Sequence, residues 1–158
     1  MRRIGLIPLL LLVLSASPAY ADVTAFIGST TTPVSRSTRG VAVGVGLLIV
    51  GFEFEYANTG ADEVEMAPQL RTGMGNVLLQ TPFPIAGLQF YATAGGGLYR
   101  ETLGDTTHTQ LGGNTGGGVK ISLIGPLRAR LDYRVFKLHG DALHPVVHRL
   151  YAGINLKF

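Results

Sequence analysis

Apolar and polar positions alternate with a period of two along most of this chain. The last ten residues show the alternation most clearly. An apolar set alternates there with a polar or small set, namely Leu150, Ala152, Ile154, Leu156 and Phe158 with Arg149, Tyr151, Gly153, Asn155 and Lys157. Successive side chains of a β-strand point to opposite faces, so the segment predicts a strand with one apolar and one polar face. Such a strand suits a barrel wall between lipid and a polar interior.

Eight segments share this period and predict eight strands. They lie at about 22–31, 40–48, 50–58, 68–80, 87–99, 110–123, 127–138 and 146–158. The longer, polar connections 32–39, 59–67, 100–109 and 139–145 alternate with the short ones 48–50, 81–86 and 124–126. An up-and-down barrel with short turns at one end and longer loops at the other has this asymmetry. The predicted fold is an all-β, eight-stranded antiparallel transmembrane barrel, and no helical period of useful length competes with it.

Charged positions gather on one face of several segments and predict a polar lumen. In segment 127–138, four successive positions on one face are charged, namely Arg128, Arg130, Asp132 and Arg134. A charge on the lipid face near the midplane costs about 2–4 kcal/mol, so this series should point inward. The expected lumen charge network comprises Glu53, Glu55, Lys120, Arg128, Arg130, Asp132 and Arg134. An eight-stranded barrel is just wide enough for side chains to fill it, so we expect paired charges without an open passage.

Other strand faces follow from the same alternation, with one exception. Valines and aromatic residues of segments 40–48 and 50–58 should face lipid, namely Val41, Val43, Val45, Phe52, Phe54 and Tyr56. Segment 68–80 does not alternate cleanly, so its lumen and lipid faces stay open.

The N-terminus predicts a cleaved secretory signal peptide. Two arginines precede an apolar stretch at 4–14, and the small-residue sequence Ala19-Tyr20-Ala21 follows. We therefore expect a signal peptide at 1–21 and one barrel domain at 22–158. Cleavage would leave 11 of the 13 basic residues against 10 acidic ones, a formal charge of +1, which argues against nucleic acid as a partner. The chain has no cysteine, which excludes disulfides, thiolate metal sites and a cysteine nucleophile.

The C-terminal spacing carries a family resemblance. Tyr151-x-Gly153-x-x-Leu156-x-Phe158 resembles the signal by which the insertion machinery recognises outer-membrane barrels. With the signal peptide and eight alternating segments, the chain resembles the small outer-membrane β-barrel domains of Gram-negative bacteria, similar in plan to the membrane domain of outer membrane protein A. The resemblance implies an integral outer-membrane location, with outer-membrane lipid and the insertion machinery as partners. An even strand count would place both termini in the periplasm.

The sequence departs from an ordinary membrane protein in lacking tryptophan. An interfacial aromatic belt would therefore rest on phenylalanine and tyrosine. The candidates are Phe26, Phe52, Phe54, Tyr56, Phe90, Tyr91, Tyr99, Tyr133, Tyr151 and Phe158.

Two glycine triplets flank the connection 100–109. A hairpin there would set triplet 95–97 against triplet 116–118 and leave a bare patch of wall. Bulky lumen side chains such as Phe136 or Arg130 could pack into that patch, since glycine offers no side chain of its own. A phosphate-binding loop is not indicated, because neither triplet opens a helix or precedes Lys-Ser/Thr.

Four histidines are the candidates for metal binding or catalysis. His139, His144 and His148 lie in or near the connection 139–145, and His108 lies in 100–109. Their spacing matches no zinc signature, and solvated loop polarity is the simpler interpretation. The lipid-deacylating members of the resembled class use a His-x-Ser pair, which none of the four forms, and Ser122 has no apparent histidine partner. We expect no enzyme, no metal and no cofactor.

Three functions of different class remain. The first, which we favour, is an integral outer-membrane barrel with a structural or surface-interaction role and a filled lumen. The second is a barrel that binds or transports a small anion or ligand among Arg128, Arg130 and Arg134. The third is a lipid-modifying enzyme that uses the loop histidines.

Overall fold

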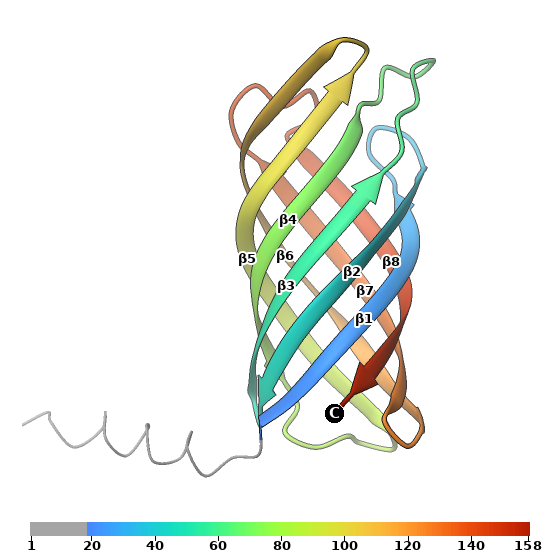
Figure 1. Cartoon of the computed structure of the whole chain (residues 1–158), viewed down its shortest axis with the longest axis vertical. Coiled ribbons are helices and arrows are strands. Elements are labelled where there is room, and N and C mark those ends of the chain that lie inside the picture. The colour runs from blue at the N-terminus through green and yellow to red at the C-terminus, as the bar shows by residue number, and fades with distance from the viewer. Residues whose placement is uncertain (1–18) are drawn as a thin grey trace, which may run out of the picture.

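The computed structural model describes residues 19–158, which form a closed antiparallel barrel of eight strands in chain order (Figure 1). The strands are β1 Ala19–Thr30, β2 Arg36–Leu47, β3 Val50–Thr59, β4 Gln69–Gln80, β5 Leu88–Leu103, β6 Thr106–Ile124, β7 Leu127–Leu138 and β8 Val146–Lys157. The eight-stranded barrel expected from the alternation is confirmed. Most of the predicted signal peptide lies outside the described residues. Its last three positions, 19–21, open β1.

The barrel closes where β1 pairs with β8. Asp22 lies opposite Lys157, and the register continues to Thr30 opposite Arg149. Beyond the ladder, the amide of Ala21 donates to the carbonyl of Phe158 at 3.0 Å, and the amide of Phe158 donates back at 2.9 Å. Closure pairs every strand edge, so no edge is left to template aggregation. Among residues 19–158 no helix is long and apolar enough to cross a membrane.

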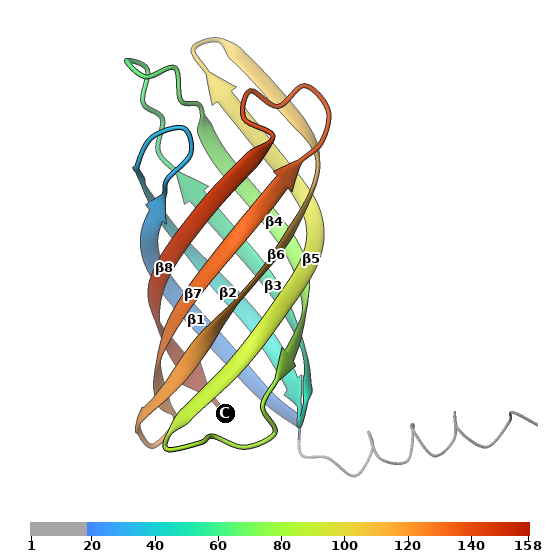
Figure 2. The same ribbon diagram turned by 180° about the vertical axis from the view of Figure 1, so that it is seen from behind.

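The two ends of the barrel differ in their connections. One end, which we call the loop end, carries the connections 31–35, 60–68, 104–105 and 139–145. The other, the turn end, carries 48–49, 81–87 and 125–126, and both the start of β1 and the C-terminus lie there (Figures 1 and 2).

The expected loop at 100–109 is wrong. Strands β5 and β6 continue through it and are joined only by Gly104 and Asp105, with Gly104 at a φ of 56° (Figure 2). The polarity of the segment predicts a loop, but the segment is rich in threonine, which favours strands. Strand β2 also begins earlier than predicted, at Arg36.

Side-chain facing follows the alternation on most strands. The outward positions predicted for β2 and β3 are exposed, and the charged face of β7 is buried inside. On β4, whose faces the pattern left open, the buried positions are Leu70, Thr72, Met74, Asn76 and Leu78. This lumen face is partly apolar. The assumption that polar residues face the lumen therefore could not assign the faces of β4.

Part of the expected aromatic belt is wrong. Four of its ten candidates are buried in the barrel, namely Phe26, Tyr91, Tyr99 and Tyr151. Each occupies a lumen position of its strand, where its ring packs on other lumen side chains. The outward aromatic residues are Phe52, Phe54, Tyr56, Phe90, Tyr133 and Phe158.

The glycine triplets do not face each other. Triplet 95–97 lies opposite residues 112–114, and triplet 116–118 lies opposite 91–93, because the β5–β6 turn is only two residues long. The second triplet does admit bulky lumen groups, but they are Tyr91 and Arg134 instead of Phe136 or Arg130. A Cβ on Gly118 would overlap the Tyr91 phenol, and one on Gly116 would lie 3.1 Å from Arg134 Cγ.

Candidate functional site

The barrel interior is the candidate site, because it gathers nearly all the buried charge. All seven residues of the lumen charge network are buried, and Glu55, Arg130 and Arg134 are fully so. They come from β3, β6 and β7, whose alternation turns these positions inward. The structure brings all seven into ion pairs.

Arg130 and Arg134 lie at the centre of the network and share two carboxylates. Arg130 pairs with both oxygens of Glu53 and donates to Asp132 at 2.9 Å. Arg134 donates to Glu53 at 2.8 Å and to Asp132 at 3.0 Å. The hydroxyl of Tyr91 donates to Asp132 and accepts from Arg130 Nε at 2.7 Å. Each buried charge therefore has several partners, as burial in a medium of low dielectric requires.

Glu55 extends the network toward the loop end. Arg149 of β8 donates to Glu55 Oε1 at 3.0 Å, and Tyr151 donates to Oε2 at 3.1 Å. The guanidinium of Arg134 lies 3.1 Å from the same carboxylate. Three carboxylates and three guanidiniums thus balance in the fully enclosed part of the lumen.

Asp22 anchors a separate group near the turn end. Lys120 donates to its carboxylate at 2.6 Å, and Arg128 donates to the same oxygen at 3.1 Å. Arg128 also donates to the side-chain oxygen of Asn155 at 2.7 Å. A cavity of about 480 Å³ opens beside this group at the barrel mouth.

Several participants were not predicted from the sequence. Asp22 and Arg149 complete the ion pairs, and Tyr91 and Tyr151 supply hydroxyls. Arg149 and Tyr151 could have been found, because they lie on the polar face of the last strand.

An apolar plug lies between the charges and the loop end. It consists of Leu70, Met74, Tyr99, Phe136, Leu138 and Val147, with Ala142 of the last loop packed against it. The Arg149 guanidinium lies 4.3 Å from the centroid of the Phe136 ring, so the plug and the charge network are in direct contact. A cavity beside Glu53 has only about 10 Å³, which is room for a single water. The middle of the barrel is therefore filled by side chains.

Hydrogen bonds tie the loops of the loop end together. Arg36 donates to the carbonyls of Thr32, Gly60 and Pro68, which joins the first two loops. Glu101 of the β5–β6 hairpin accepts from the amide of Leu143 in the last loop at 3.2 Å. These buried side chains give the loop end a defined shape.

The four histidines do not converge on one site. His108 lines a cavity of about 190 Å³ with Glu101 and Asp141, whereas His139 is exposed and His144 is half-buried. His148 Nδ1 lies 2.7 Å from the hydroxyl of Tyr133 on the outer wall. Within the described part of the chain, no group of three or more potential ligands is arranged to hold a metal ion.

The residues of the C-terminal motif divide between the two faces of β8. Tyr151 stacks on Phe26 inside the barrel, with ring centroids 4.1 Å apart, and Gly153 leaves room for Phe26 beside it. Leu156 and Phe158 are exposed on the outer wall. Packing accounts for the first two residues but not for Leu156 and Phe158.

Comparison with known proteins rests on structure. No family model matches the chain, and no curated protein sequence matches it. The crystal structure of Neisserial surface protein A (NspA) is similar with a TM-score of 0.70 and 16% identity, over 89% of this chain and 97% of that one. The N-terminal β-barrel domain of Pseudomonas aeruginosa OprF gives a TM-score of 0.66 and 16% identity, over 88% and 97%. The chain has the fold of the small outer-membrane β-barrels.

This small outer-membrane barrel fold is also that of an enzyme. The outer membrane enzyme PagL is similar with a TM-score of 0.54 and 12% identity, over 85% of this chain and 98% of that one. The fold alone therefore does not decide between a catalytic and a non-catalytic barrel. That distinction depends on the side chains of the site.

Proposed function

We propose that this chain is an integral outer-membrane barrel whose closed lumen makes it a rigid support for surface loops, with a structural or surface-interaction role. The observation that carries this proposal is the filled interior. A network of buried, ion-paired charges and an apolar plug occupy the cross-section of the barrel. Along the middle of the barrel, the outward face of the strands is mostly apolar, as contact with lipid requires. We further propose that residues 1–21 are a cleaved signal peptide and that both termini lie in the periplasm.

Transport is the weaker alternative. The arginines that would attract an anion, Arg130 and Arg134, already face carboxylates at 2.8–3.0 Å. An anion entering between them would have to displace Glu53 of β3 or Asp132 of β7, which are fixed on the barrel wall. This arrangement favours a static role for the lumen charges.

Planar bilayer recordings test the closed lumen. We expect the reconstituted barrel to show no steady conductance of the porin type, because no continuous water path passes the charge network and the plug. A barrel with Phe136, Met74 and Leu70 all replaced by alanine serves as the comparison, since it opens the plug. A large, stable conductance of the unmodified barrel would move the transport hypothesis ahead of the structural one.

A lipid-modifying enzyme finds little support in the side chains. Among residues 19–158, the one hydrogen bond of a histidine ring is to Tyr133, and no serine hydroxyl bonds to a histidine. Ser122 is near the turn end of β6, far along the barrel from the loop histidines. A nucleophile needs a base within hydrogen-bond reach, and the described residues do not provide that pair.

Insertion by the assembly machinery depends, in our proposal, on the exposed end of the C-terminal motif. Phe158→Ser keeps both backbone hydrogen bonds with Ala21, so folding in detergent should be unchanged. We expect the yield of the variant in the outer-membrane fraction of cells to fall severalfold while its export continues. Ile124→Ser is the matched control, because Ile124 is also an exposed apolar residue at the turn end. Equal outer-membrane yields of the two variants would contradict a recognition role for Phe158.

A further inference from the structure

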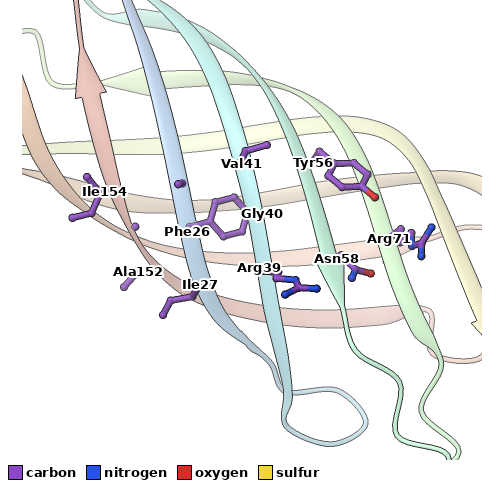
Figure 3. A pocket seen from close by; sticks show the side chains of 12 residues that line it. Phe26, Ile27, Arg39, Gly40, Val41, Tyr56, Asn58, Arg71, Ala152 and Ile154 are labelled. Atoms are coloured by element: carbon purple, nitrogen blue, oxygen red, sulfur yellow. The ribbon is translucent and has the colours of Figure 1, made fainter.

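Three arginines project from the outer wall on one rung of the sheet. Arg39 of β2 lies opposite Asn58 of β3, and Asn58 lies opposite Arg71 of β4. Arg71 in turn lies opposite Arg100 of β5. All three arginines are exposed, and Figure 3 shows Arg39, Asn58 and Arg71 following one another across adjacent strands. We call Arg39, Asn58, Arg71 and Arg100 the arginine row.

The arginine row brings like charges together without a protein counter-ion. Arg71 and Arg100 are directly opposite each other, a relation in which like charges destabilise a sheet. None of the ion pairs formed by residues 19–158 includes Arg39, Arg71 or Arg100. The four lumen arginines, by contrast, all have carboxylate partners. An anion bound from outside would relieve the repulsion along the row.

The row lies where the outer wall changes from apolar to polar. Two residues further toward the loop end, the outward positions are polar, namely Ser29, Ser37, Gln69, Thr102 and Thr107. Two residues toward the turn end, they are mostly apolar, namely Ile154, Ala25, Val41, Tyr56, Leu98 and Leu111. In a membrane barrel, the edge of the apolar band lies at the level of the lipid headgroups. The arginine row therefore faces headgroups of one leaflet.

A groove of about 740 Å³ runs along the apolar side of the row. Its walls include Ile27, Val41, Tyr56 and Ile154, and the small residues Ala25 and Ala152 leave the hollow between them. Arg39 and Arg71 border the same groove, as Figure 3 shows. One surface thus combines an apolar groove with a basic margin. These two features complement a lipid, which has apolar acyl chains and an anionic headgroup.

We propose that the groove and the arginine row bind a lipid of the surrounding leaflet whose headgroup carries phosphate. The proposal rests on the membrane location proposed above. Guanidinium groups donate two parallel hydrogen bonds to phosphate, which makes arginine the preferred residue for this contact. Arg39 and Arg100 are three strand spacings apart, roughly 14 Å, which is wider than one phosphate group. The row therefore fits a headgroup with two phosphates, and an acyl chain occupies the groove below it.

Lipid retention by the refolded barrel tests this proposal. The barrel is inserted into phosphatidylcholine nanodiscs that contain lipid A, a glycolipid with two phosphates, or its monophosphoryl form. It is then released into mild detergent and weighed by native mass spectrometry. We expect lipid A to be retained over phosphatidylcholine, and the monophosphoryl form to be retained less. Arg71→Gln/Arg100→Gln should lower lipid A retention about tenfold or more, since each charge-assisted hydrogen bond is worth about that factor.

Two matched variants separate the parts of the site. Lys137→Gln removes an exposed outward charge from β7, away from the groove, and should leave retention unchanged. Ala25→Phe fills the groove without changing charge and should lower retention. Equal retention of lipid A and phosphatidylcholine, or of lipid A by the double variant and the unmodified barrel, would overturn the proposal. So would displacement of lipid A by inorganic phosphate alone, or a mass showing a second copy of the chain in place of lipid.

If the proposed membrane location is wrong, the experiment gives a different result from the one expected when only the lipid site is wrong. In that case the barrel would not enter nanodiscs at all, and no lipid measurement would follow. A barrel that inserts and stays folded but shows no preference among lipids would contradict only the lipid site.

Discussion

Glu55→Ala should lower the free energy of unfolding of the refolded barrel by about 3–5 kcal/mol, the usual effect of breaking a buried ion pair. Glu55 is fully buried, and its two oxygens lie at 3.0 and 3.1 Å from Arg149 and Arg134. Removing the carboxylate leaves both guanidiniums short of counter-charge inside the barrel. Tyr151 also loses the acceptor of its hydroxyl. The large effect follows from burial, because water cannot replace the missing carboxylate.

Denaturant titration in lipid vesicles, followed by circular dichroism or by the gel shift of the folded barrel, measures this effect. Glu63→Ala removes an exposed carboxylate from the second loop and is the control, with nearly unchanged stability expected. Glu55→Gln/Arg149→Gln removes both partners and should be less destabilised than Glu55→Gln alone, since the unpaired charge is gone. Equal midpoints for the Glu55 and Glu63 alanine variants would refute the network.

Gly97→Ala should destabilise the barrel by about 1–3 kcal/mol, the cost of overpacking a site without free space. Gly97 of β5 lies opposite Met74, and a Cβ at this position would overlap the backbone carbonyl oxygen of Gly73. A backbone atom cannot turn aside as a flexible side chain can, so strands β4 and β5 would have to separate locally.

Gly75→Ala is the matched control for this glycine. Gly75 lies on β4 opposite Gly96, and an added Cβ would be 3.8 Å from the nearest backbone oxygen, an ordinary contact. We expect this variant to unfold at the same denaturant concentration as the unmodified barrel or slightly higher, because alanine restricts the unfolded chain. If both alanine variants unfolded at the same denaturant concentration, the close packing inferred at Gly97 would be contradicted.

Alternation predicted the strands and most of their faces because a barrel wall has two environments. On β7, the charged residues Arg128, Arg130, Asp132 and Arg134 could not face lipid. They therefore determined which face of the whole strand points inward. The same rule failed on β4, where Leu70 and Met74 face inward and form part of an apolar plug. The aromatic-belt assignment failed for Tyr91 and Tyr151, since an aromatic residue suits both the membrane interface and a packed lumen. The polarity of residues 100–109 also gave a wrong prediction of a loop, because the threonines there continue strands β5 and β6.

The partners of the lumen charges could not be predicted from the sequence. Lys120 pairs with Asp22 from 98 positions away, and Arg130 pairs with Glu53 from 77 positions away. These meetings depend on the register of each strand against its neighbours and on the tilt of the strands around the closed barrel. A shift of two residues in one register would keep every face and change every partner.

By itself, the sequence determined that this chain forms eight strands with an apolar outside and a charged inside. Successive side chains of a strand point to opposite faces, so the two environments appear as an alternation along the sequence. Only the tertiary structure decided which charges meet, where the apolar plug lies and which glycines oppose which residues. The arginine row is the clearest case. Arg39, Arg71 and Arg100 are far apart in the chain and unremarkable one by one, and only the register of four adjacent strands brings them to one level of the outer wall.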